Sequence, residues 1–381
     1  MSGKRSQGMQ SFRSALAAFL TLCLVLLGGS PLNADQKPVE VKSRRPLDIV
    51  FAVDLSGSTN GIINDIRDNL WSVVNQIGHI SPAPDLRIGF VGFSRPSFGK
   101  ENSYVRILCP LTRDYDILAA ELYKLKPVIE KGDQFVSEAI RVSVNNMRWS
   151  ESRDARKMVF LIGNGMVANN GFGFVKSCDQ ARQKNIAVHC IYIRRNHAGW
   201  IKEIPGWRRI ADMTAGLQKE ATVNSVDEVR IWKSVSSDLV PLNNRYSSTF
   251  VWMGRDSSLS RQAMLTADSG AFHAGRDAFL GRLYYKTSDV YKEKLRGCEI
   301  AGSVDLVASE PDAYIRTDNF QSRICDQYFR REQLRSQLRE AYSAGDLEEI
   351  ERSYLSGKMP DDNILHRCVL NTVYRSMGLT K

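Results

Sequence analysis

The order of apolar and polar positions divides the chain into short apolar runs and longer amphipathic stretches. Residues 47–53 form a nearly continuous apolar run, which is typical of a strand buried on both faces of a parallel sheet. Residues 62–77 follow with apolar positions at helical spacing, until Gly78 interrupts the pattern. The same patterns predict further strands at 86–93, 104–108, 158–162, 186–193 and 221–223. They predict further helices at 117–125, 136–147, 174–184, 207–213 and 226–235.

This alternation predicts an α/β fold with a doubly wound, mostly parallel sheet and right-handed crossovers. We expect the α/β domain to span residues 46–240. The alternation then stops, and residues 241–381 are predicted to form a smaller, mainly helical C-terminal region. In that region we expect mixed helix and loop at 256–290, two charged helices at 327–342 and 347–354, and a last helix at 364–377.

The N-terminus has the features of an export signal. Three basic residues, Lys4, Arg5 and Arg13, precede an apolar run over residues 15–27, and the small residue Ala34 follows it. The run is shorter than the roughly 20 apolar residues that span a bilayer core. We therefore expect a cleavable signal peptide over residues 1–34 and a polar leader over 35–45. A retained membrane anchor is the alternative.

The charge and the cysteine content are compatible with export. The formal charge of +10 is spread along the sequence, without the basic stripe and interleaved aromatic residues typical of nucleic-acid binding. Six of the seven cysteines lie beyond residue 34, and an even number in an oxidising compartment indicates disulfides. We expect a periplasmic, extracellular or cell-surface protein.

A carboxylate and two hydroxyls stand at alternate positions where the first strand ends, at Asp54, Ser56 and Ser58. Three hard oxygen ligands on one short turn suit Mg²⁺, and Mn²⁺ or Ca²⁺ are the alternatives. Asp and Ser are also favoured as helix caps, so the motif alone does not separate the two interpretations. The buried strand before it and the amphipathic helix after it favour a metal site.

In this setting residues 47–58 resemble the opening strand and the metal-ion-dependent adhesion site (MIDAS) of von Willebrand factor type A (vWA) domains. The family's motif is Asp-x-Ser-x-Ser, which Asp54, Ser56 and Ser58 match residue for residue. The resemblance implies that the serines bind the ion directly and that Asp54 holds it through water. It also implies an open coordination position that accepts an acidic residue from a partner protein.

Two further positions of the site depart from the family's pattern. In the second loop, where the family carries Thr, this chain has Asp133 and Gln134; we favour Asp133 because a carboxylate is the better Mg²⁺ ligand. In the third loop, where the family has Asp-Gly, Gly163 is followed by Asn164. This Gly-Asn variant is similar to a subgroup of exported bacterial vWA-domain proteins. A site that has lost metal binding is the alternative.

One disulfide follows from the predicted topology. Cys178 lies early in a helix and Cys190 lies late in the strand that returns along it. Both are therefore expected near the same edge of the sheet, within the roughly 4.4–6.8 Å between Cα atoms that a disulfide needs. Two buried thiols are an equally good interpretation.

No signature of an enzyme occurs along the chain. A Gly-x-Ser-x-Gly elbow, a phosphate-binding P-loop and a Gly-x-Gly-x-x-Gly motif are all missing. We expect neither an enzyme nor a small-molecule substrate, but an exported, divalent-metal-dependent protein-binding module. The alternative is a structural envelope protein that uses the vWA-like fold as a metal-free scaffold and makes its contacts through the C-terminal region.

Overall fold

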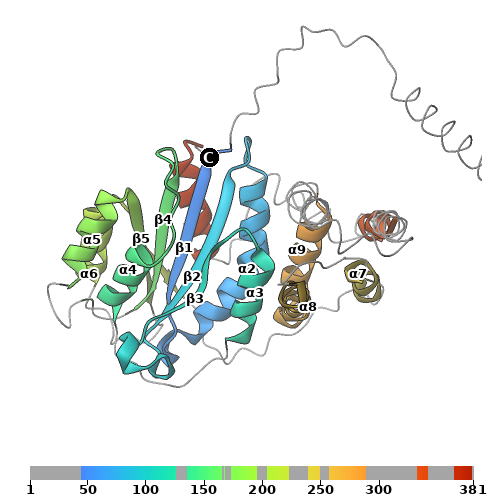
Figure 1. Ribbon diagram of the computed structural model, residues 1–381, viewed down its shortest axis with the longest axis horizontal. Helices are drawn as coiled ribbons and strands as arrows, with labels where there is room; N and C mark the ends of the chain where they lie inside the picture. The colour runs from blue at the N-terminus through green and yellow to red at the C-terminus, as the bar shows by residue number, and fades with distance from the viewer. Residues whose placement is uncertain are drawn as a thin grey trace, which may run out of the picture. The chain divides into compact units, whose positions relative to one another are not determined.

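Six strands form one sheet in the order β3-β2-β1-β4-β5-β6 (Figure 1). The computed structural model describes residues 44–125, 135–164, 167, 173–194, 204–222, 239–248, 257–288, 333–341 and 364–379. All neighbouring strands are parallel except β3, which runs antiparallel to β2. The expected doubly wound, mostly parallel α/β sheet is therefore confirmed. The strands are β1 (Pro46–Asp54), β2 (Asp85–Phe93), β3 (Arg106–Thr112), β4 (Arg156–Gly163), β5 (Ile186–Arg194) and β6 (Gln218–Thr222).

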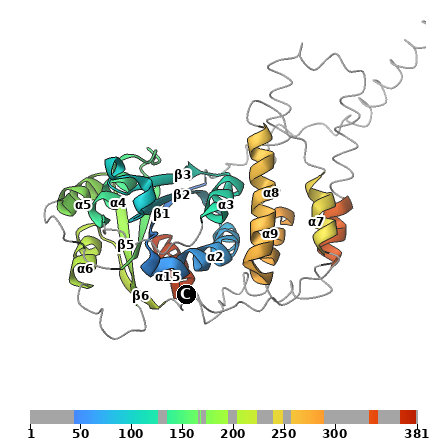
Figure 2. The same cartoon turned by 90° about the horizontal axis from the view of Figure 1, so that it is seen from below.

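Helices cover both faces of the sheet (Figures 1 and 2). On one face lie α4 (Val136–Asn145), α5 (Gly173–Gln183) and α6 (Ile204–Met213). On the other lie α2 (Asn60–Gly78) and α3 (Tyr115–Lys124). Alternate residues of β1 contribute to the two cores, which is why the strand is apolar throughout.

Two strands differ from their predicted positions. The third was expected at 104–108 but begins at Arg106 and continues to Thr112, because Ser103 and Tyr104 have left-handed backbone conformations that no strand accommodates. The last was expected at 221–223 but is β6, which begins at Gln218. Most residues of β6 are polar, as is common in edge strands. The apolar pattern therefore did not reveal where the strand begins. The helix predicted at 226–235 lies outside the described residues.

The mainly helical character expected of the C-terminal region is confirmed. Mixed helix and loop was expected at 256–290, and the structure has two helices there, α8 (Ser257–Ala274) and α9 (Arg276–Thr287). They follow α7 (Leu239–Ser247), and α8 packs against α3 while α9 packs against α2. Of the predicted charged helices, the first is described only at 333–341, where it is helical, and 347–354 lies outside the described residues.

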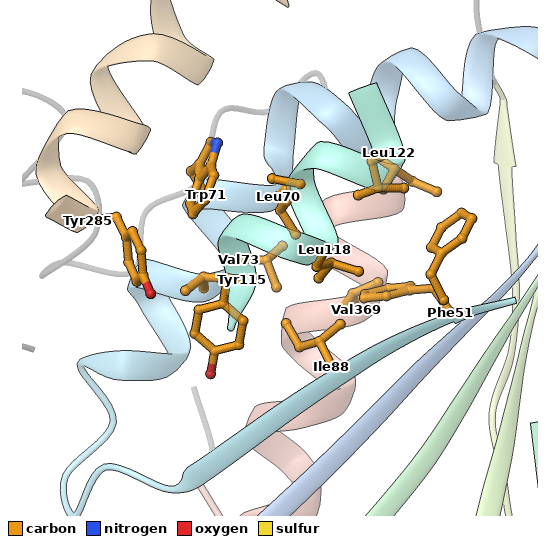
Figure 3. Packing of buried hydrophobic residues seen from close by; sticks show 14 of the residues in the cluster. Phe51, Leu70, Trp71, Val73, Ile88, Tyr115, Leu118, Leu122, Tyr285 and Val369 are labelled. Carbon is orange, nitrogen blue, oxygen red and sulfur yellow. The ribbon is translucent and has the colours of Figure 1, made fainter. Parts of the chain in front are cut away.

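The last helix, α15 (Ile364–Ser376), packs beside α2 and β6, about 140 residues beyond that strand in sequence (Figure 2). Figure 3 shows Val369 of α15 in the same apolar core as Phe51 of β1 and Leu118 of α3. The final helix of the chain therefore completes the core on the α2 side of the sheet. Within the described residues, no helix has the length and apolar character needed to cross a membrane.

Candidate metal-binding site

Asp54 is the last residue of β1, at the edge of the sheet where the parallel strands end. Its side chain is fully buried, and its Oδ1 accepts a hydrogen bond from the Ser56 amide at 2.9 Å. The Ser56 hydroxyl and the Asn164 amide also donate to this carboxyl group. The structure therefore brings together three of the residues predicted from the sequence, Asp54, Ser56 and Asn164.

The second carboxylate oxygen of Asp54, Oδ2, is buried and has no hydrogen-bond partner among the described residues. Burial raises the pKa of Asp54 from 3.8 to about 6, although the hydrogen bonds from Ser56 and Asn164 favour the ionised form. An unpaired buried acceptor costs about 1–3 kcal/mol, and more when it is charged. A cation, or water bound to one, would remove this cost.

A close approach of β4 to β1 fixes the surroundings of Asp54. A methyl group added at Gly163 would lie 2.7 Å from Asp54 Cβ, 3.3 Å from Oδ2 and 3.4 Å from the ring of Trp207. Any side chain at Gly163 would therefore displace Asp54. Trp207 is fully buried, so its ring belongs to the core.

The turn after Asp54 does not act as a conventional helix cap. The N-cap residue of α2 is Thr59, which makes no side-chain hydrogen bond to the first turn of the helix. Its hydroxyl instead donates backwards, to the carbonyl oxygens of Asp54 at 2.7 Å and Ser56 at 2.9 Å. The Asp54 carboxylate bonds to Ser56, ahead of the helix. The cap interpretation therefore fails for Asp54, and its carboxylate remains available to a ligand.

Three of the predicted ligands are not described. The backbone of Ser58 lies in the 3-10 turn Gly57–Thr59, but its side chain is outside the described part, as are Asp133 and Gln134. Phe135, the next described residue, contacts Tyr104 with ring centroids 5.0 Å apart. Where the structure describes side chains, no three His, Cys, Asp or Glu residues gather into a group that would hold a metal. A metal at this site would be held by Asp54 together with hydroxyl and amide oxygens, such as those of Ser56 and Asn164.

Sequence reasoning did not identify Ser94 as part of this edge. It follows β2 directly, and the register pairs its neighbour Phe93 with Asp54. Ser94 is fully buried, has a left-handed backbone with φ of 63°, and its hydroxyl has no partner among the described residues. Its position directly after a buried strand was the one sequence feature that could have identified it. The unusual backbone could not be predicted.

The two cysteines predicted at this side of the sheet are buried free thiols in the structure, Cys178 in α5 and Cys190 in β5. Burial raises the pKa of Cys178 to about 12 and that of Cys190 well above its usual value. Cys178 also contributes to the raised pKa of Cys190, and both cysteines belong to the same apolar core. The structure has the two-thiol arrangement, and a disulfide between them stays a prediction.

Comparisons with known proteins found one matching family and several similar structures. Residues 48–224 match the von Willebrand factor type A domain. The fold is similar to that of BatB from Bacteroides thetaiotaomicron, at 17% identity over 47% of this chain and 91% of that chain, with a TM-score of 0.34. It is also similar to the SpRpn10 VWA domain, at 14% identity over 47% and 89% of the two chains, with a TM-score of 0.36. A third similar structure is proximal thread matrix protein 1 from the mussel byssus with a zinc-occupied MIDAS motif, at 18% identity over 47% and 44%, with a TM-score of 0.34.

The identities and TM-scores of these structures are too low to transfer ligands or partners to this chain. The assignment rests on the family match and on the order of the strands. Residues 48–224 of this chain therefore form a von Willebrand factor type A domain.

Proposed function

We propose that this chain is an exported protein-binding module whose vWA domain holds a divalent metal ion beside Asp54. One observation carries the proposal: Asp54 is fully buried, and its Oδ2 has no hydrogen-bond partner among the described residues. A buried carboxylate in this state favours its neutral form. A dication placed there offsets the desolvation and keeps the carboxylate ionised.

The surrounding donors fit a hard cation. Ser56 and Asn164 approach Asp54 in the structure, and the sequence adds Ser58 and either Asp133 or Gln134. Oxygen donors without thiolate or imidazole favour Mg²⁺, with Mn²⁺ and Ca²⁺ as the alternatives. When bound, the ion supplies a positively charged coordination position that accepts a carboxylate from another protein.

The partner in this proposal is another protein, reached outside the cytoplasm. The N-terminal signal and the even number of remaining cysteines support export, to the periplasm or cell surface of a bacterium. Mass spectrometry of the protein recovered after export tests this part. Cleavage near Ala34 is expected, and an intact N-terminus would mean a retained anchor. The proposal is for binding without turnover, so hydrolysis of any ester or phosphate in a substrate panel would contradict it.

Isothermal titration of the protein with Mg²⁺ and Mn²⁺ tests the metal site. We expect saturable binding that Asp54→Ala abolishes, and that the matched variant Asp277→Ala leaves unchanged because Asp277 is exposed on α9. Comparing Asp133→Ala with Gln134→Ala then identifies the ligand from the second loop. If the intact protein binds neither ion, the vWA domain is a metal-free scaffold and the metal-dependent proposal is wrong.

A further inference from the structure

The loop over residues 94–106, here called the rim loop, connects β2 to β3 beside the Asp54 site. The Leu55 amide donates to the Phe93 carbonyl oxygen at 2.9 Å, which ties the start of the rim loop to the turn after Asp54. A methyl group at Gly92 would meet both Leu55 Cδ1, at 2.5 Å, and Phe98 Cε2, at 3.0 Å. Phe98 of the rim loop therefore packs beside the residue that follows Asp54.

The other end of the rim loop contacts the second predicted metal loop. The ring of Tyr104 lies 5.0 Å from that of Phe135, and Phe135 follows Asp133 and Gln134 directly in sequence. The rim loop thus packs against residues that adjoin two of the segments from which metal ligands are predicted. Arg106 pairs with Gly92 of β2, and β2 pairs with β1, which ends at Asp54; a partner that placed a carboxylate beside Asp54 would therefore lie close to this loop.

The rim loop is held in an unusual and rigid conformation. Three of the five described non-glycine residues with positive φ lie in it: Ser94, Ser103 and Tyr104. Hydrogen bonds within the loop fix it, among them Ser103 N to Lys100 O at 2.9 Å and Asn102 Nδ2 to Phe98 O at 3.0 Å. Strained backbone of this kind concentrates at functional sites, and a loop that is already ordered loses little entropy on binding.

Positive charge dominates the surface of the rim loop. The guanidinium groups of Arg95 and Arg106 lie over the ring of the buried Phe98, at 6.0 and 4.9 Å from its centroid. Lys100 and Arg106 are exposed, and neither has a carboxylate partner among the described residues. The single acidic residue, Glu101, accepts a hydrogen bond from the Asn102 side chain at 3.3 Å.

Two pairs of opposite charges on neighbouring elements neutralise each other. Glu138 and Arg141 form an ion pair on α4, and Arg194 of β5 pairs with Glu220 of β6. Among the described residues, Lys100 and Arg106 of the rim loop therefore add positive charge that these ion pairs do not offset. Cations arranged beside a binding site select partners of opposite charge and accelerate their association.

We infer that the rim loop selects a partner segment with several acidic residues, one for the metal and others for Lys100 and Arg106. The metal contact in this inference rests on the proposed function. A nucleic acid fits less well because Phe98 is buried and Tyr104 packs on Phe135, which leaves no exposed ring for base stacking. An anionic membrane fits less well because the exposed residues of the loop include no large apolar side chain to insert.

Fluorescence anisotropy with labelled heptapeptides tests the inference on the full chain in Mg²⁺. One glycine peptide carries three glutamates, a second carries one, and a third carries three glutamines. The three-glutamate peptide is expected to bind most tightly. Lys100→Gln combined with Arg106→Gln is expected to weaken its binding about fivefold, the combined effect of two exposed ion pairs. The matched variant, Arg148→Gln with Arg153→Gln, makes the same charge change at the opposite end of the sheet and is expected to bind like the wild type.

Additional variants distinguish a failure of this inference from a failure of the proposed function. Arg106→Lys keeps the charge and is expected to bind as tightly as the wild type, which excludes loss of folding as the cause. If the rim variant binds normally while Asp54→Ala does not, the rim inference is wrong and the metal proposal stands. If binding depends on the rim charges but not on Asp54 or chelator, the rim inference stands and the metal proposal is wrong. The rim inference is also wrong if no acidic peptide binds, or if duplex DNA or anionic vesicles bind more tightly.

Discussion

The buried carboxylate of Asp268 offers a sharp test of how the C-terminal helices are attached. It lies in α8 and accepts hydrogen bonds from Arg282 Nε at 2.9 Å and Lys286 Nζ at 2.8 Å. Arg282 also bonds to Asp116 of α3 and lies over the ring of Trp71 of α2, at 4.4 Å from its centroid. The cluster therefore joins the C-terminal helices to the vWA domain. Asn243 at 3.3 Å and Ser247 at 2.9 Å, both in α7, complete the contacts to Asp268.

Asp268→Asn leaves the two buried cations with one of the two carboxylates that the described residues supply, that of Asp116. Removing one member of a buried ion pair costs about 3–5 kcal/mol, because the remaining charge is uncompensated. Burial already lowers the pKa of Lys286, and Asp268 opposes that shift, so the variant can limit the cost by releasing the lysine proton. We therefore predict a loss of about 3 kcal/mol in the free energy of unfolding at neutral pH, at the lower end of that range.

Urea denaturation followed by tryptophan fluorescence and circular dichroism measures this loss, with Trp71 reporting on the cluster. The matched control is Asp277→Asn in α9, whose side chain is 84% exposed and pairs with Arg276 at 3.4 Å. We expect the control to change stability by less than about 0.5 kcal/mol. Equal stabilities for the Asp268 and Asp277 variants would refute the reasoning. The pH dependence of the free energy of unfolding is a second check. A lysine whose pKa is lowered in the folded state destabilises the fold as pH falls. The Asp268 variant is therefore expected to recover stability as pH rises toward about 10.

Three further predictions concern the rest of the chain. Burial lowers the pKa of His189 from 6.5 to about 4, and its Nδ1 accepts a hydrogen bond from the Leu217 amide at 3.1 Å; stability is therefore lost as pH falls through this window, by up to about 3 kcal/mol. His189→Asn, which keeps an acceptor, is expected to flatten the unfolding curve against pH, and an unchanged slope would contradict this. Leu370→Ala removes a fully buried side chain of α15 and is expected to cost about 2–5 kcal/mol in urea denaturation, whereas the exposed neighbour Asn371→Ala is expected to cost almost nothing. Because the pKa of metal-free Asp54 is raised to about 6, protons compete with the metal, and calorimetric Mg²⁺ affinity is expected to fall between about pH 7.5 and about pH 5; a constant affinity would mean that Asp54 takes no part.

The sequence predicted the central strands well because burial on both faces makes them apolar throughout. The strand β1, for example, is buried from Leu47 to Asp54. Predictions failed where long-range partners decide the structure. The helix α9 carries two fully buried cations, Arg282 and Lys286, so its apolar periodicity is broken. The carboxylate partners lie 14 to 166 residues away, and no local pattern reveals them.

In the candidate site, too, residues close together in sequence could be predicted and long-range contacts could not. Asp54 and Ser56 stand two residues apart, so their grouping was visible in the sequence. Asn164 was placed by resemblance, and its amide bond to Asp54 agrees with that placement. The tight contact at Gly163 and the left-handed Ser94 depend on how neighbouring strands end. Such tertiary contacts have no periodic signal along the chain.

Crystals of the protein grown with Mn²⁺, with anomalous scattering recorded from the metal, test the central claim most directly. We predict an anomalous peak within bonding distance of the Ser56 hydroxyl, about 2.1 Å for a small hard cation, and within reach of Asp54 Oδ2 through one water. The same peak is expected to be missing from crystals of Asp54→Ala. A protein saturated with Mn²⁺ that shows no peak beside Asp54, or a peak only elsewhere, would contradict a metal-dependent role for this vWA domain.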